Sequence, residues 1–210
     1  MPLSLQKEEA PWSDWQVDLS IMHTSFPELL REIQNKDHPL IGIDGFGAAG
    51  KSTLAEKIKS RITSAQIIHI DDFYKPSQVR SGKKSHSILN EDFDWDRLEE
   101  EVFNKIINNK SAFRYQRYDW VSDTLAEFIQ VDARLPIIVE GVFSLQRRFF
   151  NLYDVTIWID VSEDAIIKRA IERDGIAVMD KWINEWQPIE RNYFQSERPD
   201  TKAQFVVLGE

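Results

Sequence analysis

Apolar residues along the chain gather in five short runs, and the stretches between the runs are more polar. The runs are LIGID (40–44), AQIIHID (65–71), LPIIVEG (135–141), YDVTIWID (153–160) and AQFVVLG (203–209). Compact apolar runs of this length are typical of strands that are buried on both faces of a parallel sheet. We therefore expect five strands in a mainly parallel central sheet.

Between these runs, apolar residues recur at the three- or four-residue spacing of a helix face. The predicted helices are 26–35, with Phe26, Leu29, Leu30 and Ile33 on one face; a segment from Lys51, with Leu54, Ile58 and Ile62; 96–107, with Leu98, Val102 and Ile106; and a segment that begins at Ser162 as its N-cap. Alternation of strands and helices predicts an α/β fold of three layers, with helices on both faces of the sheet.

The start of this alternation suggests the domain boundaries. Residues 1–38 are expected to form an N-terminal helical extension packed on the core, and residues 39–210 the main domain, with a short helical lid at about 169–190. The stretch 75–92 is polar and holds the densest basic cluster of the chain, so we expect a mobile loop there. Three of its basic side chains are expected to face solvent, namely Arg80, Lys83 and Lys84.

Composition excludes several classes of protein. The 210 residues include 26 basic and 35 acidic side chains, a net charge of −9, and 42% are hydrophobic. This composition suits one globular domain and argues against disorder, and the acidic balance argues against a nucleic-acid groove.

The chain contains no cysteine, which excludes disulfides and thiolate metal or catalytic sites. No run reaches the ~18 apolar residues of a membrane span, and no apolar signal segment opens the chain. We expect a cytoplasmic protein that does not bind a membrane.

The segment GFGAAGKST, which begins at Gly45, fits two glycine patterns. Gly45, Gly47 and Gly50 satisfy the G-x-G-x-x-G pattern of dinucleotide-binding folds, and Gly45, Gly50, Lys51 and Ser52 satisfy the G-x-x-x-x-G-K-[ST] pattern of phosphate loops. A Lys–Ser pair fits poorly where a dinucleotide fold needs close helix packing, so the phosphate loop is favoured. A dinucleotide site and a purely structural turn remain as alternatives.

In a phosphate loop, backbone amides and the positive end of the following helix surround the phosphates of a nucleoside triphosphate. Lys51 would place its charge on the β- and γ-phosphates, and Ser52 would place a hydroxyl on Mg²⁺. The residues expected to hold ATP or another triphosphate are Gly45, Gly47, Ala48, Ala49, Gly50, Lys51, Ser52 and Thr53.

Two strand ends carry acids that suit phosphoryl transfer. The 65–71 run leads into Asp71 and Asp72, at the sheet edge where ligands bind in open α/β folds. Because strand side chains alternate, we expect only one of the two to face the site. The 135–141 run holds a lone acid, Glu140, which suits a magnesium-organising carboxylate. Solvated turn carboxylates and a surface glutamate are the alternatives.

An ordered series of motifs resembles the uridine kinase and phosphoribulokinase-like branch of P-loop kinases. The series is GFGAAGKST, HIDDFYKP, NEDFDWDRL, RYDWVSD, IIVEGVF and YDVTIWID, and the resemblance runs from about Leu40 to Val207. It implies a P-loop NTPase fold and an ATP- and Mg²⁺-dependent kinase whose acceptor is a small-molecule hydroxyl, most simply that of a nucleoside.

The resemblance also implies roles for single residues. Asp71 is the implied catalytic carboxylate, and Glu140 is implied to help hold magnesium. Together with the loop and helix arguments, we expect Lys51 and Arg169 as further catalytic residues and Ser52, Glu140 and Asp71 as the metal set. The resemblance implies Asp94, Tyr118 and, more loosely, Trp120 as substrate-binding residues. We also expect Asp72, Tyr74 and Asp123 to contact the substrate.

The sequence departs from the family at three points. Asp123 stands where uridine kinases usually carry a histidine that contacts the pyrimidine. In the family, an acid of the Phe-Asp (F-D) segment, here Phe93 and Asp94, binds the ribose of the acceptor; because this segment continues as WDRL, Asp94 and Asp96 compete for that role. The lid lacks an Arg-Gly-Arg-type stretch and reads DGIAVMDKWINEW instead. Kinase activity is therefore better supported than uridine specificity. A kinase for another acceptor (a riboside, vitamin precursor or sugar) and a nucleotide-binding regulatory ATPase are the alternatives.

Arginines after the fourth strand could supply charge to the transferring group. Arg169 and Arg173 are four residues apart, hence on one helix face, where they could close over the phosphates. The alternative is a solvated helix with Glu172 and Asp174 as partners. Arg191 and Arg198 are further candidates to face the nucleotide.

Three less specific expectations remain. We expect His69 to be a core residue and Trp95 to lie near the acceptor. A homo-oligomer is compatible with the sequence.

Overall fold

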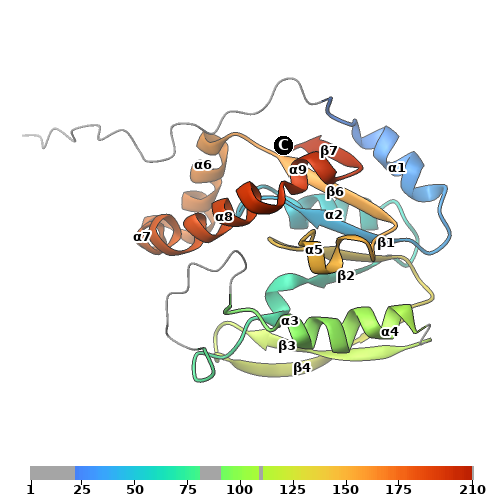
Figure 1. Cartoon of the computed structure of the whole chain (residues 1–210), viewed down its shortest axis with the longest axis horizontal. Coiled ribbons are helices and arrows are strands. Elements are labelled where there is room, and N and C mark those ends of the chain that lie inside the picture. The colour runs from blue at the N-terminus through green and yellow to red at the C-terminus, as the bar shows by residue number, and fades with distance from the viewer. Residues whose placement is uncertain (1–21, 81–90, 109–110, 210) are drawn as a thin grey trace, which may run out of the picture.

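A computed structural model describes residues 22–80, 91–108 and 111–209 of the chain. Its centre is a parallel five-stranded sheet in the order β2-β5-β1-β6-β7 (Figure 1). The strands are β1 (Leu40–Asp44), β2 (Gln66–His69), β5 (Ile137–Glu140), β6 (Val155–Asp160) and β7 (Phe205–Leu208). All five predicted strands are confirmed.

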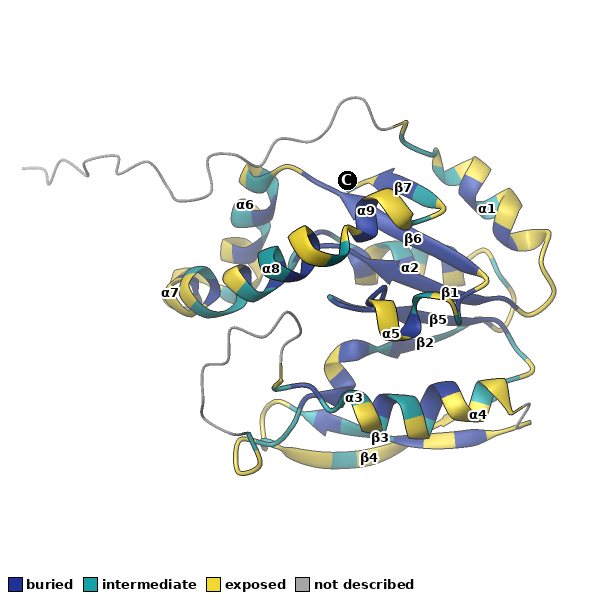
Figure 2. Ribbon diagram, viewed as in Figure 1, coloured by how far each residue is buried: buried dark blue, intermediate teal, exposed yellow. Residues whose placement is uncertain are grey.

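The sheet is buried on both faces, as the continuous apolar runs predict. Along β1, Ile41 and Ile43 join one hydrophobic cluster, and Leu40 joins another. In Figure 2 the strands form a dark, buried layer between helices that are exposed on their outer sides. This arrangement confirms the α/β fold with helices on both faces.

The helices of the structure extend beyond those predicted from the sequence. They are α1 (Phe26–Gln34), α2 (Lys51–Lys59), α3 (Trp95–Leu98), α4 (Asn104–Ile107), α5 (Arg147–Phe150), α6 (Glu163–Asp174), α7 (Met179–Lys181), α8 (Gln187–Glu197) and α9 (Pro199–Lys202). A π-type turn joins α3 to α4 at Glu99–Phe103, and another joins α7 to α8 at Trp182–Trp186. None of the helices in the described ranges is long and apolar enough to cross a membrane.

The N-terminal part of the described chain packs on the core. Leu29 and Ile33 of α1 are buried in the same cluster as β1, and the backbone amide of Thr24 donates to the carbonyl of Val206 in β7, at 2.7 Å. Ser25 begins α1 with a capping box to Glu28. The segment that precedes residue 22 lies outside the described residues.

An antiparallel hairpin was not among the predicted elements. β3 (Phe113–Asp119) pairs with β4 (Thr124–Val131) apart from the main sheet, and lies beside α3 and α4 (Figure 1). Most residues of β4 are exposed (Figure 2). A strand with so little burial leaves a weak hydrophobic pattern, which explains why it escaped prediction.

The second predicted strand is shorter than its apolar run. β2 ends at His69, and Ile70–Phe73 form a single 3₁₀ turn. The predicted loop 75–92 is only partly described, because 81–90, including Lys83 and Lys84, lies outside the described residues. Arg80 was wrongly expected to face solvent: its guanidinium lies 4.9 Å from the ring centre of Tyr74.

Candidate functional site

A cavity of about 1050 Å³ opens where the strands of the main sheet end. Ligands in open α/β folds bind at this edge. Residues 47–54 line the cavity together with Glu140 at the end of β5 and Asp71 of the 3₁₀ turn. At one side it extends to residues 23–26 and 207–209. The cavity is large enough to hold two small ligands end to end.

The glycine loop joins β1 to α2 and turns into the helix at Gly50. Gly50 has a φ of +100°, in the left-handed region that favours glycine. The buried Lys51 folds back, and its Nζ donates to the carbonyls of Gly45 at 3.0 Å and Phe46 at 2.8 Å. A positive charge therefore lies inside the loop, beside the positive end of α2.

All but one of the predicted phosphate-loop residues line the cavity. Lining residues are Gly47, Ala48, Ala49, Gly50, Lys51, Ser52 and Thr53. Gly45, the first residue of the loop, does not line the cavity, and its carbonyl accepts a hydrogen bond from Lys51. The loop is thus an open concave surface of backbone and one ammonium group, a suitable receptor for an anion.

Glu140, at the end of β5, connects the loop to β2. Ser52 Oγ donates to Glu140 Oε1 at 3.0 Å, and His69 Nδ1 lies 2.5 Å from the same oxygen. Burial alone would raise the pKa of Glu140, but the contacts with His69 and Lys51 hold it below its usual value. The same contact raises the pKa of His69. His69 is not the core residue expected, because 45% of its side chain is exposed.

The two adjacent acids of the 3₁₀ turn have different surroundings. Asp71 lines the cavity, where desolvation, and next the charge of Glu140, raise its pKa. Asp72 is buried and accepts a hydrogen bond from the Tyr115 hydroxyl at 2.8 Å. Only Asp71 is brought to the site, so the prediction of a substrate contact for Asp72 finds no support in the geometry.

Aromatic rings surround the end of the cavity beyond Asp71. Tyr74, Phe93 and Trp120 line it, and the rings of Tyr74 and Trp120 are 4.5 Å apart. Trp120 is 49% exposed and lines the cavity, so part of its indole is accessible to a ligand. Tyr118 is buried behind them, 5.1 Å from Trp120, and supports the indole rather than lining the cavity.

Asp123 is engaged at the tip of the hairpin and does not line the cavity. It accepts hydrogen bonds from the amide and hydroxyl of Ser77, from the Tyr118 hydroxyl at 2.6 Å, and from Arg80 at 3.4 Å. Ser77 and Tyr118 lower the pKa of Asp123 to about 2. This carboxylate ties the 75–80 segment to the hairpin and has little capacity left for a substrate.

Neither of the competing acids of the F-D segment lines the cavity. Asp94 caps α3 and accepts from the amide of Arg97 at 3.1 Å. Asp96 is exposed and pairs with Arg148 at 2.7 Å. Trp95 packs on Phe93, at 4.9 Å between ring centres, and so supports the aromatic end of the cavity from behind.

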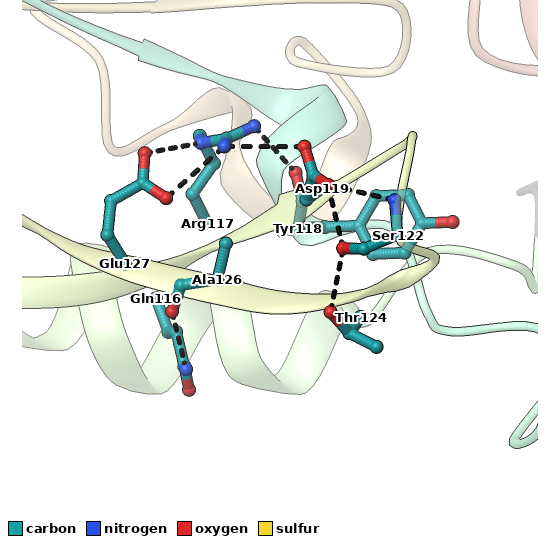
Figure 3. A network of polar contacts seen from close by, with 8 residues as sticks. All are labelled: Gln116, Arg117, Tyr118, Asp119, Ser122, Thr124, Ala126 and Glu127. Atoms are coloured by element: carbon teal, nitrogen blue, oxygen red, sulfur yellow. Dashed lines mark hydrogen bonds and ion pairs between the residues drawn. The ribbon is translucent and has the colours of Figure 1, made fainter.

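A polar network stiffens the hairpin that carries Trp120 (Figure 3). Arg117 donates to Glu127 across the two strands at 2.9 Å, and lies 3.5 Å from Asp119. Asp119 accepts from the amide of Ser122 at 2.9 Å, which closes the turn around Trp120. The hairpin is therefore held by its own side chains and not only by backbone pairing.

Arg169 and Arg173 of α6 both line the cavity. Arg169 donates to the carbonyls of Ala49 at 3.2 Å and Gly209 at 3.3 Å, and thus connects the loop to the residue that follows β7. Arg173 is more exposed and pairs with Asp174 at 2.7 Å. The other two arginines point elsewhere: Arg191 pairs with Glu163, and Arg198 with Asp200.

Sequence reasoning missed two buried acids beneath the loop. Asp44, the last residue of β1, accepts from the amides of Gly45 and Leu145 and from the hydroxyl of Tyr193. Glu190 of α8 accepts from the amide of Gly47 at 2.8 Å. The position of Asp44 directly before the loop was a usable signal, whereas nothing near Glu190 in sequence indicated its place.

Comparisons with known proteins agree with this geometry. The model of the Phosphoribulokinase / Uridine kinase family matches residues 40–178. A uridine kinase of Staphylococcus aureus is 29% identical over 182 residues, and one of Staphylococcus haemolyticus is 26% identical over 185; both alignments cover 81% of this chain and 87% of the relative. A possible uridine kinase from Bacillus stearothermophilus has the same fold, with a TM-score of 0.65 at 22% identity, and 85% of this chain and 95% of that chain are covered.

Proposed function

Because the chain belongs to the phosphoribulokinase and uridine kinase family, we propose that it transfers the γ-phosphoryl group of ATP, or of another nucleoside triphosphate, to a hydroxyl of a small molecule. The observation that carries the proposal is one cavity that joins the glycine loop, Asp71 and an aromatic end. A phosphate donor and a hydroxyl acceptor can meet there, with the carboxylate between them.

Positioning and charge do most of the work in such a transfer. The loop amides and the start of α2 bind the phosphates, and Lys51 leaves its loop carbonyls to contact them. Arg169 already bonds to Ala49 in the loop and Arg173 lies near it, so guanidinium charge is available as negative charge spreads over the transferring group.

Ser52 and Glu140 fit a magnesium ion. Their oxygens are 3.0 Å apart at the cavity wall, and hydroxyl and carboxylate oxygens are the donors that Mg²⁺ prefers. Mg²⁺ neutralises charge on the phosphates when it is bound. His69 would then keep Glu140 oriented through its other contact.

Asp71 is the proposed base. It orients the acceptor hydroxyl and takes its proton as the new P–O bond forms. Its raised pKa, caused first by desolvation and next by Glu140, makes it a better proton acceptor than an ordinary aspartate. Proton transfer to a carboxylate of this kind suits a hydroxyl made acidic by attack on phosphorus.

A nucleoside is the acceptor class best supported. Tyr74, Phe93 and Trp120 offer aromatic faces for a flat ring, and the curated relatives are named uridine kinases. Asp123, which stands where the family usually carries a histidine for the pyrimidine, is bonded to Ser77 and Tyr118 instead. This observation favours a riboside with another ring as the second candidate acceptor.

A screen of acceptors tests the proposal. The full chain with Mg²⁺ and ATP or GTP is incubated with nucleosides, other ribosides and sugar alcohols, and both diphosphate release and phosphorylated acceptor are measured. We expect acceptor-dependent release that is fastest with a nucleoside or riboside. Hydrolysis at one rate with every acceptor would support the regulatory ATPase instead.

A further inference from the structure

Helix α8 contacts the start of the glycine loop through two side chains one helical turn apart. Tyr193 donates its hydroxyl proton to Asp44 at 2.7 Å, and Glu190 accepts from the amide of Gly47 at 2.8 Å. Glu190 is 8% exposed and still lines the cavity. A carboxylate oxygen therefore accepts a hydrogen bond from a loop amide that would otherwise be available to a phosphate.

The charges around Glu190 show which part of a nucleotide it would meet. Lys51 from α2 and Arg173 from α6 face it as cations, and Asp44 from β1 and Asp71 from the 3₁₀ turn face it as anions. Asp71 is the proposed base, so the transferring phosphoryl group must lie between it and the loop. Glu190 lines the same cavity and interacts with Asp71 and Lys51, so it would lie near the terminal phosphate of a bound triphosphate.

We propose that the Glu190 carboxylate is a built-in competitor of the terminal phosphate, which holds Gly47 in the nucleotide-free protein and gives up its negative charge when a triphosphate binds. The inference rests on the proposed function, since it presumes that the loop binds a nucleoside triphosphate. It assigns to α8 a control on the affinity for triphosphate over diphosphate.

Protonation is the simplest way for Glu190 to lose its charge. Burial raises the pKa of Glu190 to about 7, against the opposing effect of the Gly47 amide. At neutral pH a proton can therefore be taken up as the phosphate arrives. An ionised carboxylate and a phosphate that compete for the same amide in a shielded site repel each other, so triphosphate affinity should fall as the pH rises through 7.

Calorimetric titration of the full chain tests this with Mg²⁺ and a non-hydrolysable ATP analogue, at pH 6 and pH 8. Glu190→Gln keeps an oxygen for the Gly47 amide and removes the charge. This variant should bind the analogue about tenfold more tightly than wild type at pH 8, because that pH is about one unit above the pKa of Glu190 and most of the wild-type carboxyl group is ionised. At pH 6 the wild-type carboxyl group is mostly protonated, so the two proteins should bind equally. ADP should show a smaller difference.

Glu172→Gln is the matched control, because it removes the same charge from an exposed position on α6. It should follow the wild type at both pH values. A measurement on wild type alone avoids any folding defect of the variant: at pH 7, binding of the analogue should take up about half a proton, read from titrations in buffers of different ionisation enthalpy.

Equal affinities of wild type and Glu190→Gln at both pH values, with no proton uptake by wild type, would overturn the inference and leave the proposed function intact. Failure of wild type to bind the analogue at either pH would overturn the proposed function, and the inference with it. The two failures are thus distinguishable.

Discussion

Asp71 and Asp72 are neighbours in sequence, and the backbone separates their roles. A 3₁₀ turn directs Asp71 into the cavity and leaves Asp72 buried under the hydroxyl of Tyr115. Lys51 is similarly specific, because the helix that begins at it puts its ammonium group back inside the loop. At the scale of single residues, the site depends on which of several polar side chains the local backbone aims at one point.

Loss of the Lys51 charge should weaken both nucleotide binding and turnover. A charge-assisted hydrogen bond contributes about 1.5–3 kcal/mol, so Lys51→Ala should reduce triphosphate affinity by roughly 10–100-fold. Calorimetric titration gives the affinity, and Lys59→Ala, an exposed lysine at the far end of α2, is the control. Wild-type affinity in Lys51→Ala would count against the phosphate loop itself.

At the scale of elements, the main sheet and its loops supply only part of the cavity lining, and the hairpin and α8 add further residues to it. β3 and β4 carry Trp120 to the acceptor end, and their cross-strand pair of Arg117 and Glu127 holds that position (Figure 3). Helix α8 supplies Glu190 and Tyr193 to the loop from below. Trp120 lies with Tyr74 at the aromatic part of the cavity and Glu190 is bonded to the glycine loop, so each element should affect a different substrate.

Trp120 should affect the acceptor and not the nucleotide. Stacking on an aromatic ring contributes on the order of 1 kcal/mol, so Trp120→Ala should raise the KM for the acceptor about fivefold. Nucleotide affinity should stay at its wild-type value. Val121→Ala is the control, because Val121 is 96% exposed on the same turn. A larger change in nucleotide affinity than in acceptor KM would contradict the assignment of this end of the cavity.

Elements buried on both faces could be predicted from the sequence, and elements that depend on distant partners could not. LIGID and its four counterparts reveal strands because burial leaves no polar position in them. β4 is mostly exposed and leaves no such signal. Asp123 was expected at the substrate because of its motif, but its partner Ser77 is 46 residues away in sequence. Glu190 contacts a loop 143 residues distant, and no local pattern reports such a contact.

At the scale of the whole molecule, a chain with a net charge of −9 gathers cations at one cavity. Lys51, Arg169 and Arg173 all line it, so the local potential can favour a polyanion while the surface as a whole does not. Beneath these cations lie two buried acids, Asp44 and Glu190. Burial raises the pKa of both carboxyl groups, so folding near neutral pH should take up protons at the core of the site.

This proton uptake makes stability depend on pH. Burial raises the pKa of Asp44 to about 6 and of Glu190 to about 7, so the folded protein binds both protons more tightly than the unfolded chain. Their contribution to stability is complete below about pH 4 and is lost as the pH rises through 6 and 7. The free energy of unfolding in urea should therefore decrease between pH 5 and pH 8.

Glu190→Gln isolates one of the two groups. At pH 8 its free energy of unfolding should exceed that of the wild type by on the order of 1–3 kcal/mol, because the ionised Glu190 is then buried in the wild type. At pH 5 the wild-type carboxyl group is protonated when folded, so the difference should be clearly smaller. Urea denaturation at the two pH values measures this. A difference that stays constant from pH 5 to pH 8 would show that the carboxyl group does not change its protonation on folding.

Asp71 bears most directly on the central claim of phosphoryl transfer to a hydroxyl. The decisive measurement compares wild type and Asp71→Asn for transfer of labelled γ-phosphate from ATP to the best acceptor, with ATP affinity measured in parallel. We predict that Asp71→Asn binds ATP almost as wild type does and transfers at least about 100-fold more slowly, as for a lost general base. Unchanged transfer in Asp71→Asn would contradict the claim.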